Sequence, residues 1–260
     1  MYIYWFLIGG IVLRIALIGY GRMGKAVEKV ALERNHVIIS IDPLDSTATF
    51  KEINAEALKD VDVCIDFSSP SVVLNNAKLV SFLGKNLIMG TTGWYNEMDK
   101  MKEIVKDIGF LWSGNFSIGM NVFFHAVKET AKVMNNLPEY DAAVYEIHHN
   151  QKKDSPGGSA QIIGKIIVDN MDRKKKIVGD RFTERKPEAD ELHVASVRCG
   201  SIPGTHTVLF DCPVDTIELK HVARGREGFA FGAVLAAEFV NSKKGFYNID
   251  DLMKQVIGKK

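Results

Sequence analysis

Cysteine is scarce in this chain, which has only Cys64, Cys199 and Cys212 among its 260 residues. An odd number of cysteines without metal-type spacing argues against a disulfide framework and against a cysteine-based zinc site. Cys64 lies inside an apolar run, where a small core residue is expected. Reduced thiols are typical of cytoplasmic proteins, so we expect a cytoplasmic location.

An excess of charge of either sign is also lacking. The chain has 33 Lys and Arg against 32 Asp and Glu, a formal net charge of +1. Binding to nucleic acid or to a membrane surface through bulk charge needs a strong positive excess. We therefore expect neither as a partner. The one notable basic cluster, residues 173–176, lies in a polar stretch typical of a solvated loop.

Long apolar runs are missing as well. Residues 1–13 carry no charge, but this stretch is shorter than the about 20 residues of a membrane span and lacks the basic start of a secretory signal. We expect the functional chain to begin near Val12, with residues 1–11 as an extension of unknown role. The overall composition, 46% hydrophobic and 25% charged, is typical of a globular protein that can bury a sizeable core.

A glycine-rich turn follows the first apolar run, residues 12–18, and precedes a helix-like segment. Its sequence is Gly19-Tyr-Gly-Arg-Met-Gly24. In a dinucleotide-binding turn, Gly19 permits the tight bend, Gly21 permits close approach of a pyrophosphate, and Gly24 lets helix and strand pack. The order of strand, turn and helix therefore predicts a nucleotide site.

Asp42 ends the second apolar run, residues 36–41, and stands 18 residues after Gly24. Dinucleotide-binding folds place a carboxylate near that distance to bind the adenosine ribose. A simple turn residue before Pro43 is the alternative reading of Asp42.

Strand-like and helix-like segments continue to alternate up to residue 118. This alternation predicts a doubly wound, Rossmann-type parallel sheet over residues 12–118, with ligands at the carboxyl ends of its strands. The further strands are expected at 61–67, 87–89 and 110–112, with helices at 71–83 and 96–107.

The pattern changes after a helix expected at 118–134. Short strand-like runs separated by turns predict a second, α+β domain over residues 119–228, built on a mixed or antiparallel sheet. Its strands are expected at 141–147, 192–199, 206–210 and 216–222, with a charged loop at 172–190. The segment 229–240 is apolar nearly all round, so we expect it to be a buried helix and assign residues 229–260 to the first domain.

Between these strands, two adjacent histidines, a lysine and a Gly-Gly-Ser turn share one short stretch. His148 and His149 precede Lys152, and Gly158 and Ser159 open a helix-like run. Free amides at a helix start favour an anion, and histidine or lysine can move a proton near neutral pH. This combination suits a small carboxylate that is protonated during reaction. A structural histidine pair and a solvated lysine are the alternatives.

A metal site is not expected in this stretch. Adjacent side chains on a strand point to opposite faces, and no cysteine cluster is near the two histidines.

The chain resembles the dihydrodipicolinate reductases, also called 4-hydroxy-tetrahydrodipicolinate reductases, over about residues 12–240. The most specific part is similar to the family motif E-x-H-H-x-x-K-x-D-x-P-S-G-T-A, although Gly157 replaces its serine and Ser159 its threonine. Supporting matches are Arg22-Met-Gly24, Asp66-Phe-Ser68, Gly90-Thr-Thr-Gly93, Asn115-Phe-Ser-x-Gly-x-Asn121 and Arg198-x-Gly-x-Ile-x-Gly-x-His206.

This resemblance implies hydride transfer from reduced nicotinamide to a cyclic, unsaturated dicarboxylate in lysine and diaminopimelate biosynthesis. It assigns His148 and Lys152 to proton transfer, His149 to substrate contact, and Gly158 and Ser159 to a substrate carboxylate. It also implies a homotetramer. The residues that it assigns to the cofactor are Gly19, Tyr20, Gly21, Arg22, Met23, Gly24, Asp42, Gly90, Thr91, Thr92, Ser113, Gly114, Asn115 and Phe116.

The choice of cofactor depends on Asp42 and Arg22. A carboxylate at Asp42 accepts hydrogen bonds from the ribose hydroxyls of NADH and repels the 2′-phosphate of NADPH, whereas Arg22 can reach toward that phosphate. We expect NADH to be preferred and NADPH tolerated. Two other functions stay open: a different two-domain nicotinamide-dependent dehydrogenase of amino-acid metabolism, and a non-catalytic dinucleotide sensor.

Overall fold

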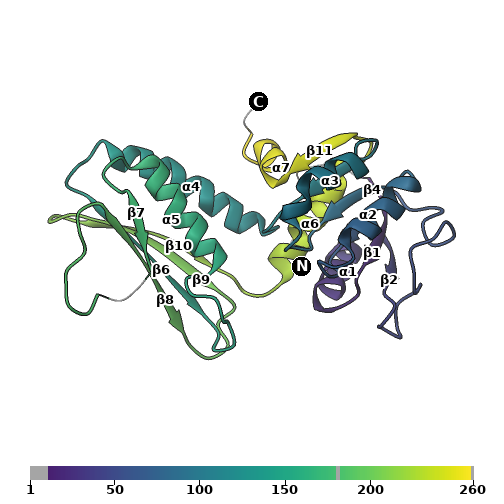
Figure 1. Ribbon diagram of the computed structural model, residues 1–260, viewed down its shortest axis with the longest axis horizontal. Coiled ribbons are helices and arrows are strands. Elements are labelled where there is room, and N and C mark those ends of the chain that lie inside the picture. Colours follow the sequence, from purple (N-terminus) through teal and green to yellow (C-terminus); the bar gives the residue numbers. More distant parts are fainter. Residues whose placement is uncertain (1–10, 180–181, 259–260) are drawn as a thin grey trace. The chain divides into compact units, whose positions relative to one another are not determined.

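The structure is a computed structural model that describes residues 11–179 and 182–258. The expectation for the N-terminal extension therefore falls almost wholly outside the described residues. The chain forms two compact units (Figure 1): one runs up to Ile118 and resumes at Arg226, and the other is Gly119–Gly225. None of the helices in the described ranges is long and apolar enough to cross a membrane.

The first unit is built on a six-stranded sheet with the order β11-β5-β4-β3-β1-β2, in which every neighbouring pair is parallel. The Rossmann-type prediction is confirmed. The strands are β1 (Arg14–Ile18), β2 (Val37–Ile41), β3 (Val63–Asp66), β4 (Asn86–Met89), β5 (Gly109–Trp112) and β11 (Gly245–Asn248).

Helices cover both faces of this sheet, and the side chains of β1 show why its sequence is apolar throughout. Ile15 and Leu17 belong to one core cluster, whereas Ala16 and Ile18 belong to another. Successive residues of a strand point to opposite faces, so a strand buried on both faces needs apolar residues at every position. The helices are α1 (Arg22–Glu33), α2 (Val73–Phe82), η1 (Tyr95–Glu97), α3 (Met98–Ile104), α6 (Glu227–Val240) and α7 (Ile249–Val256).

The second unit pairs two helices with a five-stranded mixed sheet of order β10-β9-β6-β8-β7 (Figure 1). β6 runs parallel to β8 and antiparallel to β9. The α+β prediction is confirmed. The elements are α4 (Ile118–Asn135), β6 (Asp141–His148), α5 (Gly158–Asn170), β7 (Lys176–Val178), β8 (Glu191–Arg198), β9 (Thr205–Asp211) and β10 (Thr216–Val222).

The expectation of an unbroken loop at 172–190 is wrong, because β7 forms the edge of the second sheet there. Lys174, just before it, is 2% exposed and donates to the carbonyls of Ala189 and Glu191. A strand of three residues has too little alternation to be recognised, and a buried lysine reads as a solvent-facing residue in the sequence.

Candidate active site

The glycine turn of the first unit has the geometry of a nucleotide-binding turn. Gly19 has a φ of +87°, and a Cβ there would lie 2.6 Å from the carbonyl oxygen of Phe67. A Cβ at Gly24 would lie 2.3 Å from the Gly19 carbonyl oxygen, so a side chain there would clash with the turn. At Gly21 a Cβ would meet nothing within 4 Å. The turn is therefore closed toward the protein at Gly19 and Gly24 and open at Gly21, a shape that fits the close approach of a pyrophosphate.

Helix α1 begins directly after Gly21, and no side chain caps its first turn. The first amides of a helix have no acceptor within the helix and attract an anion. No acidic residue lies in this first turn. The turn and the helix start together fit the diphosphate of a dinucleotide.

Asp42 closes the turn after β2. Its Oδ2 accepts a hydrogen bond from the backbone N–H of Tyr20 at 2.7 Å, and its Oδ1 accepts from the amides of Leu44 and Asp45 at 2.8 and 3.1 Å. Burial alone would raise the pKa of Asp42, but these three donors outweigh it and the pKa lies below its usual value. Asp42 therefore stabilises the turn through these hydrogen bonds and also carries a negative charge. Since each carboxylate oxygen accepts about two hydrogen bonds, Oδ2 has room for a ribose hydroxyl.

The loops after β3 and β4 are joined by Asp66, which is fully buried. Its Oδ1 accepts hydrogen bonds from the hydroxyls of Ser68 and Thr91, both at 2.7 Å. A Cβ at Gly90 would lie 2.2 Å from the Phe67 ring. Gly90 and Thr91 therefore pack against the loop after β3, whereas Thr92 is exposed.

The loop after β5 also turns side chains inward. Ser113 Oγ donates to the Asn115 carbonyl at 2.9 Å, and Phe116 is 2% exposed, with its ring 6.2 Å from that of Phe67. In the glycine turn, the hydroxyl of Tyr20 donates to Glu28. Of the remaining predicted cofactor residues, Arg22 and Met23 begin helix α1, Arg22 exposed and Met23 packed against the core, and Gly114 lies in the loop after β5.

The carboxyl ends of β1, β2, β4 and β5 therefore carry all fourteen residues predicted to hold the cofactor, because parallel strands end at one edge of the sheet. Several of these side chains, such as that of Phe116, pack inward and leave only backbone groups to face a ligand.

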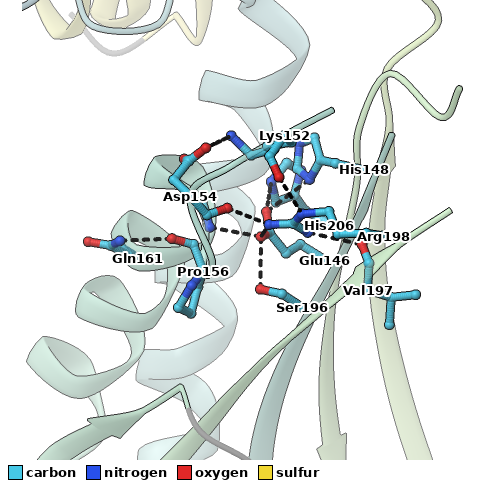
Figure 2. A network of polar contacts seen from close by, with 11 residues as sticks. Glu146, His148, Lys152, Asp154, Pro156, Gln161, Ser196, Val197, Arg198 and His206 are labelled. Atoms are coloured by element: carbon cyan, nitrogen blue, oxygen red, sulfur yellow. Dashed lines mark hydrogen bonds and ion pairs between the residues drawn. The ribbon is translucent and has the colours of Figure 1, made fainter. Parts of the chain in front are cut away.

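The second unit carries a polar cluster centred on Glu146, near the end of β6 (Figure 2). This carboxylate is fully buried, and its Oε1 accepts from the Gly157 amide at 2.8 Å, Ser196 Oγ at 2.9 Å and Arg198 Nη2 at 3.0 Å. Burial would raise the pKa of Glu146, but these donors and His148 hold it below the usual value. Glu146 is ionised at neutral pH.

Two imidazoles lie beside the other carboxylate oxygen. His148 Nδ1 is 3.0 Å and His206 Nε2 is 3.6 Å from Glu146 Oε2, but neither contact is a hydrogen bond. Burial lowers the pKa of both histidines, and nearby Lys152 lowers both further, with His206 reaching about 4. Both rings are therefore neutral at pH 7.

Lys152 lies in the loop beyond β6, where its Nζ is 2.8 Å from both carboxylate oxygens of Asp154. The backbone carbonyls of these two residues accept hydrogen bonds from Arg198 at 3.3 and 2.5 Å. A Cβ at Gly157 would lie only 2.7 Å from Lys152 Cε, so the glycine leaves the space that the lysine side chain occupies. The amine is thereby held near His148 (Figure 2).

Helix α5 begins at Gly158, as the Gly-Gly-Ser turn predicted. The amide of Gly157, which precedes the helix, donates to Glu146. Gly158 is exposed, and a Cβ there would meet nothing within 4 Å. The helix start adjoins the loop of Lys152, and its geometry fits a substrate carboxylate.

The structure brings His148, Lys152 and the α5 start together, whereas His149 lies outside the polar network of Figure 2. Glu146 and His206 were not among the predicted site residues. A signal for them exists: Glu146 and His148 are two residues apart on one strand, so they share a face, and His206 is the cross-strand partner of Glu146. The pairing of β6 with β9 is needed to find it.

Known families match both units. The family described as dihydrodipicolinate reductase, N-terminus, matches residues 13–116, and dihydrodipicolinate reductase, C-terminus, matches residues 119–253. The chain belongs to the dihydrodipicolinate reductase family. The resemblance stated from the sequence is confirmed.

Relatives within this reductase family are similar over almost their whole length. The 4-hydroxy-tetrahydrodipicolinate reductase of Christiangramia forsetii is 36% identical over 246 residues, covering 94% of this chain and 99% of the relative. That of Caldanaerobacter subterraneus is 37% identical over 248 residues, covering 90% and 95%.

Among solved structures, the dipicolinate-bound dihydrodipicolinate reductase from Paenisporosarcina sp. TG-14 matches with a TM-score of 0.74 at 20% identity, covering 93% of this chain and 99% of that one. Aspartate semialdehyde dehydrogenase II from Vibrio cholerae matches with a TM-score of 0.51 at 11% identity, covering 88% and 98%. Identities this low show a shared fold.

Proposed function

We propose that this reductase converts 4-hydroxy-tetrahydrodipicolinate to tetrahydrodipicolinate in the biosynthesis of lysine and diaminopimelate. The observation that carries this function is the arrangement of His148, Lys152 and the start of α5 in one site of the second unit. It supplies a proton donor and an anion site together, which the reduction of a small carboxylate needs.

The hydroxyl group leaves with one ring proton as water, and the unsaturated ring then gains one hydride and one proton. Reduced nicotinamide supplies the hydride when bound. Lys152 is the proton donor, since an ammonium group carries protons that it can give up. Burial keeps the pKa of His148 low, so this neutral ring accepts a proton or a hydrogen bond at pH 7. The amides of Gly158 and Ser159 hold a substrate carboxylate, and His149 contacts the substrate.

The cofactor is held by the first unit, along the carboxyl edge of β1 to β5. NADH is preferred and NADPH tolerated. The preference is supported by Asp42, whose lowered pKa keeps a negative charge at the end of β2. The tolerance is supported by Arg22, which is exposed in the glycine turn.

The active species is a homotetramer joined through the sheet of the second unit. Apolar side chains on strands of that sheet support this assembly, since Val197 and Val222 are 48% and 57% exposed. Exposed apolar side chains on one sheet are typical of an interface between subunits. Sedimentation equilibrium measures the assembly directly.

The test of the function is the loss of reduced-nicotinamide absorbance with freshly generated 4-hydroxy-tetrahydrodipicolinate as substrate. We expect turnover with this compound and none with aspartate semialdehyde, the substrate type of a different two-domain dehydrogenase. Dinucleotide binding without turnover of either compound would instead identify a non-catalytic sensor and overturn the proposal.

A further inference from the structure

Three buried polar atoms of the second unit, on Glu146, His148 and His206, face one another without hydrogen bonds. Within the described part of the chain, Glu146 Oε2, His148 Nδ1 and both ring nitrogens of His206 have no hydrogen-bond partner. Glu146 is fully buried and His206 is 6% exposed. Buried polar atoms without partners are rare, and an ion or a water at the site is a common explanation. This cluster therefore points to a ligand.

The spacing of these atoms fits a small transition-metal ion. One ligand atom from each of the three residues lies within 4.8 Å of the others. His148 Nδ1 and His206 Nε2 are 3.0 and 3.6 Å from Glu146 Oε2. Neighbouring ligands of a tetrahedral zinc ion lie about 3.4 Å apart, given zinc–ligand bonds of about 2.1 Å. Two of the three ligand pairs therefore already lie close to the spacing that zinc requires.

The surroundings hold the carboxylate in the orientation that a metal needs. Three donors, from Gly157, Ser196 and Arg198, all bind Oε1, so Oε2 stays turned toward the two imidazoles (Figure 2). Hydrogen bonds behind a ligating group orient it and strengthen metal binding. Three protein ligands leave the fourth position of a tetrahedral zinc ion for a water molecule.

Local charge permits a dication. Lys152 is paired with Asp154, and Arg198 is paired with Glu146, so these four side chains sum to zero before a metal enters. Binding does not have to overcome a net positive charge. The expectation of no metal site was based on His148 and its neighbour His149. The present cluster instead joins His148 to Glu146, on the same strand β6, and to His206 on β9.

We propose that Glu146, His148 and His206 form a Zn²⁺ site. Two imidazoles and one carboxylate with an open fourth position is a donor set that zinc favours, while Mg²⁺ prefers six oxygen ligands. Occupation of the site engages His148 Nδ1 and fixes its ring, so zinc inhibits the reductase. The inhibition rests on the proposed function, but the binding does not.

The first experiment measures zinc binding to the full chain by competition with a chromophoric chelator. All proteins carry Cys199→Ser, because Cys199 is an exposed thiol that could itself bind zinc. We expect one zinc per chain, with affinity reduced roughly 10–100-fold or more in His206→Gln and in His148→Gln. The matched control is His193→Gln, a histidine on β8 of the same sheet that contacts Phe182 instead. Its affinity should equal that of the unsubstituted chain.

A second measurement needs no ligand substitution and guards against variants that fail to fold. Co²⁺ added to the Cys199→Ser chain should give the intense visible absorption of a four-coordinate ion, and Zn²⁺ should abolish it. Absence of both stoichiometric zinc binding and the cobalt spectrum would overturn the site and leave a buried water as the occupant of the cluster.

The third measurement is reductase activity with Zn²⁺, with Mg²⁺ at equal ionic strength, and after EDTA. Inhibition by zinc alone, reversed by EDTA, supports the full proposal. Zinc that binds with the expected dependence on His206 but leaves turnover unchanged would retain the metal site and overturn the assigned role of His148. Failure of zinc to bind, with normal turnover, would overturn the metal site and leave the proposed function intact.

Discussion

At the scale of single residues, the two carboxylate oxygens of Glu146 have different neighbours. Oε1 is occupied by three donors from the loop before α5 and from β8, and Oε2 faces His148 and His206. The sequence shows Glu146 two residues before His148, but it does not show that a third side chain from β9 completes the group. The residues close together in the sequence could be recognised as a group, but a partner from a distant strand, such as His206, could not.

The proton-transfer roles predict the effect of two substitutions. Lys152→Ala and His148→Gln should each lower kcat by about 10²–10⁴-fold, the usual effect of losing a general acid or base. Dinucleotide affinity, measured by fluorescence, should stay unchanged, because the cofactor residues lie in the other unit. Lys153→Ala, at the exposed neighbouring position, is the matched control and should keep the normal kcat. Near-normal kcat in both test variants would remove these residues from catalysis.

The low pKa of His206 predicts how stability depends on pH. The pKa is about 4 in the folded chain, against a usual value of 6.5, chiefly because the ring is buried. Between these values the unfolded chain binds a proton that the folded chain does not, so the stabilising contribution is complete above pH 6.5 and is lost as pH falls toward 4. The neighbouring groups that affect it are His148, His221 and Lys152, which lower its pKa, and Glu146, which raises it.

Urea unfolding at pH 7 and pH 4.5 measures this dependence. The unsubstituted chain should lose roughly 2 kcal/mol more unfolding free energy on acidification than His206→Gln. His193→Gln, which removes a histidine of the same sheet outside the cluster, is the control. Equal acid sensitivity of the chain and its His206→Gln variant would show that His206 is not buried as a neutral ring.

The charge of Asp42 predicts the choice of cofactor. Two like charges about 4 Å apart repel by about 1 kcal/mol in water and by more at a partly buried site, so NADH should be favoured about tenfold in kcat/KM. Asp42→Asn removes the charge and keeps Oδ1 for the amides of Leu44 and Asp45. NADPH should gain in this variant and lose in Arg22→Ala. Equal kcat/KM for both cofactors in the unsubstituted enzyme would remove Asp42 from this role.

At the scale of elements, the buried strands and the helix starts were the predictable features. The apolar run around β1 and the helix that begins at Gly158 both appear near the expected positions. The three-residue strand β7 was not predictable, because its pairing with β8 comes from the sheet and not from its own sequence. The role of Gly157 was also hidden, since only the fold places Lys152 beside it.

The start of α5 gives a test of the carboxylate site. Gly158 is the first residue of the helix, where proline is tolerated, and Gly157 has the extended backbone (φ −69°, ψ 161°) that a residue before proline requires. Gly158→Pro should therefore fold normally but lose one amide donor, raising KM roughly 10–100-fold. Gly158→Ala retains the amide and is the matched control. Pyridine-2,6-dicarboxylate should inhibit the alanine variant much more than the proline variant. Equal inhibition of the two would exclude the amide as a ligand.

At the scale of the whole molecule, the class of both units was predictable because the order of elements differs between them. Alternation of strands and helices led to the parallel sheet, and strands joined by short turns led to the mixed one. The C-terminal completion of the first sheet was not predicted. β11 and α7 follow a polar stretch, and their residues are only partly apolar, so their place beside β5 depends on a surface that the rest of the fold creates.

This C-terminal completion leads to a prediction for truncated chains. β11 pairs with β5, the rings of Phe246 and Phe110 stack at 5.0 Å, and Leu252 and Met253 are 1% and 5% exposed. Each fully buried apolar side chain of this size contributes about 1.5–3 kcal/mol, so losing Leu252 and Met253 together with the partly buried Phe246 removes a large part of the about 5–15 kcal/mol that stabilises a domain.

A chain that ends at residue 242 should therefore lose dinucleotide binding and the thermal transition of the first unit. Binding of pyridine-2,6-dicarboxylate to the second unit should persist, because no residue described for the carboxylate site lies beyond His206. A chain that ends at residue 257 retains both elements and is the control. Calorimetry with each ligand separates the two units. If the shorter chain kept the melting temperature and dinucleotide affinity of the control, β11 and α7 would be dispensable additions to a sheet already stable without them.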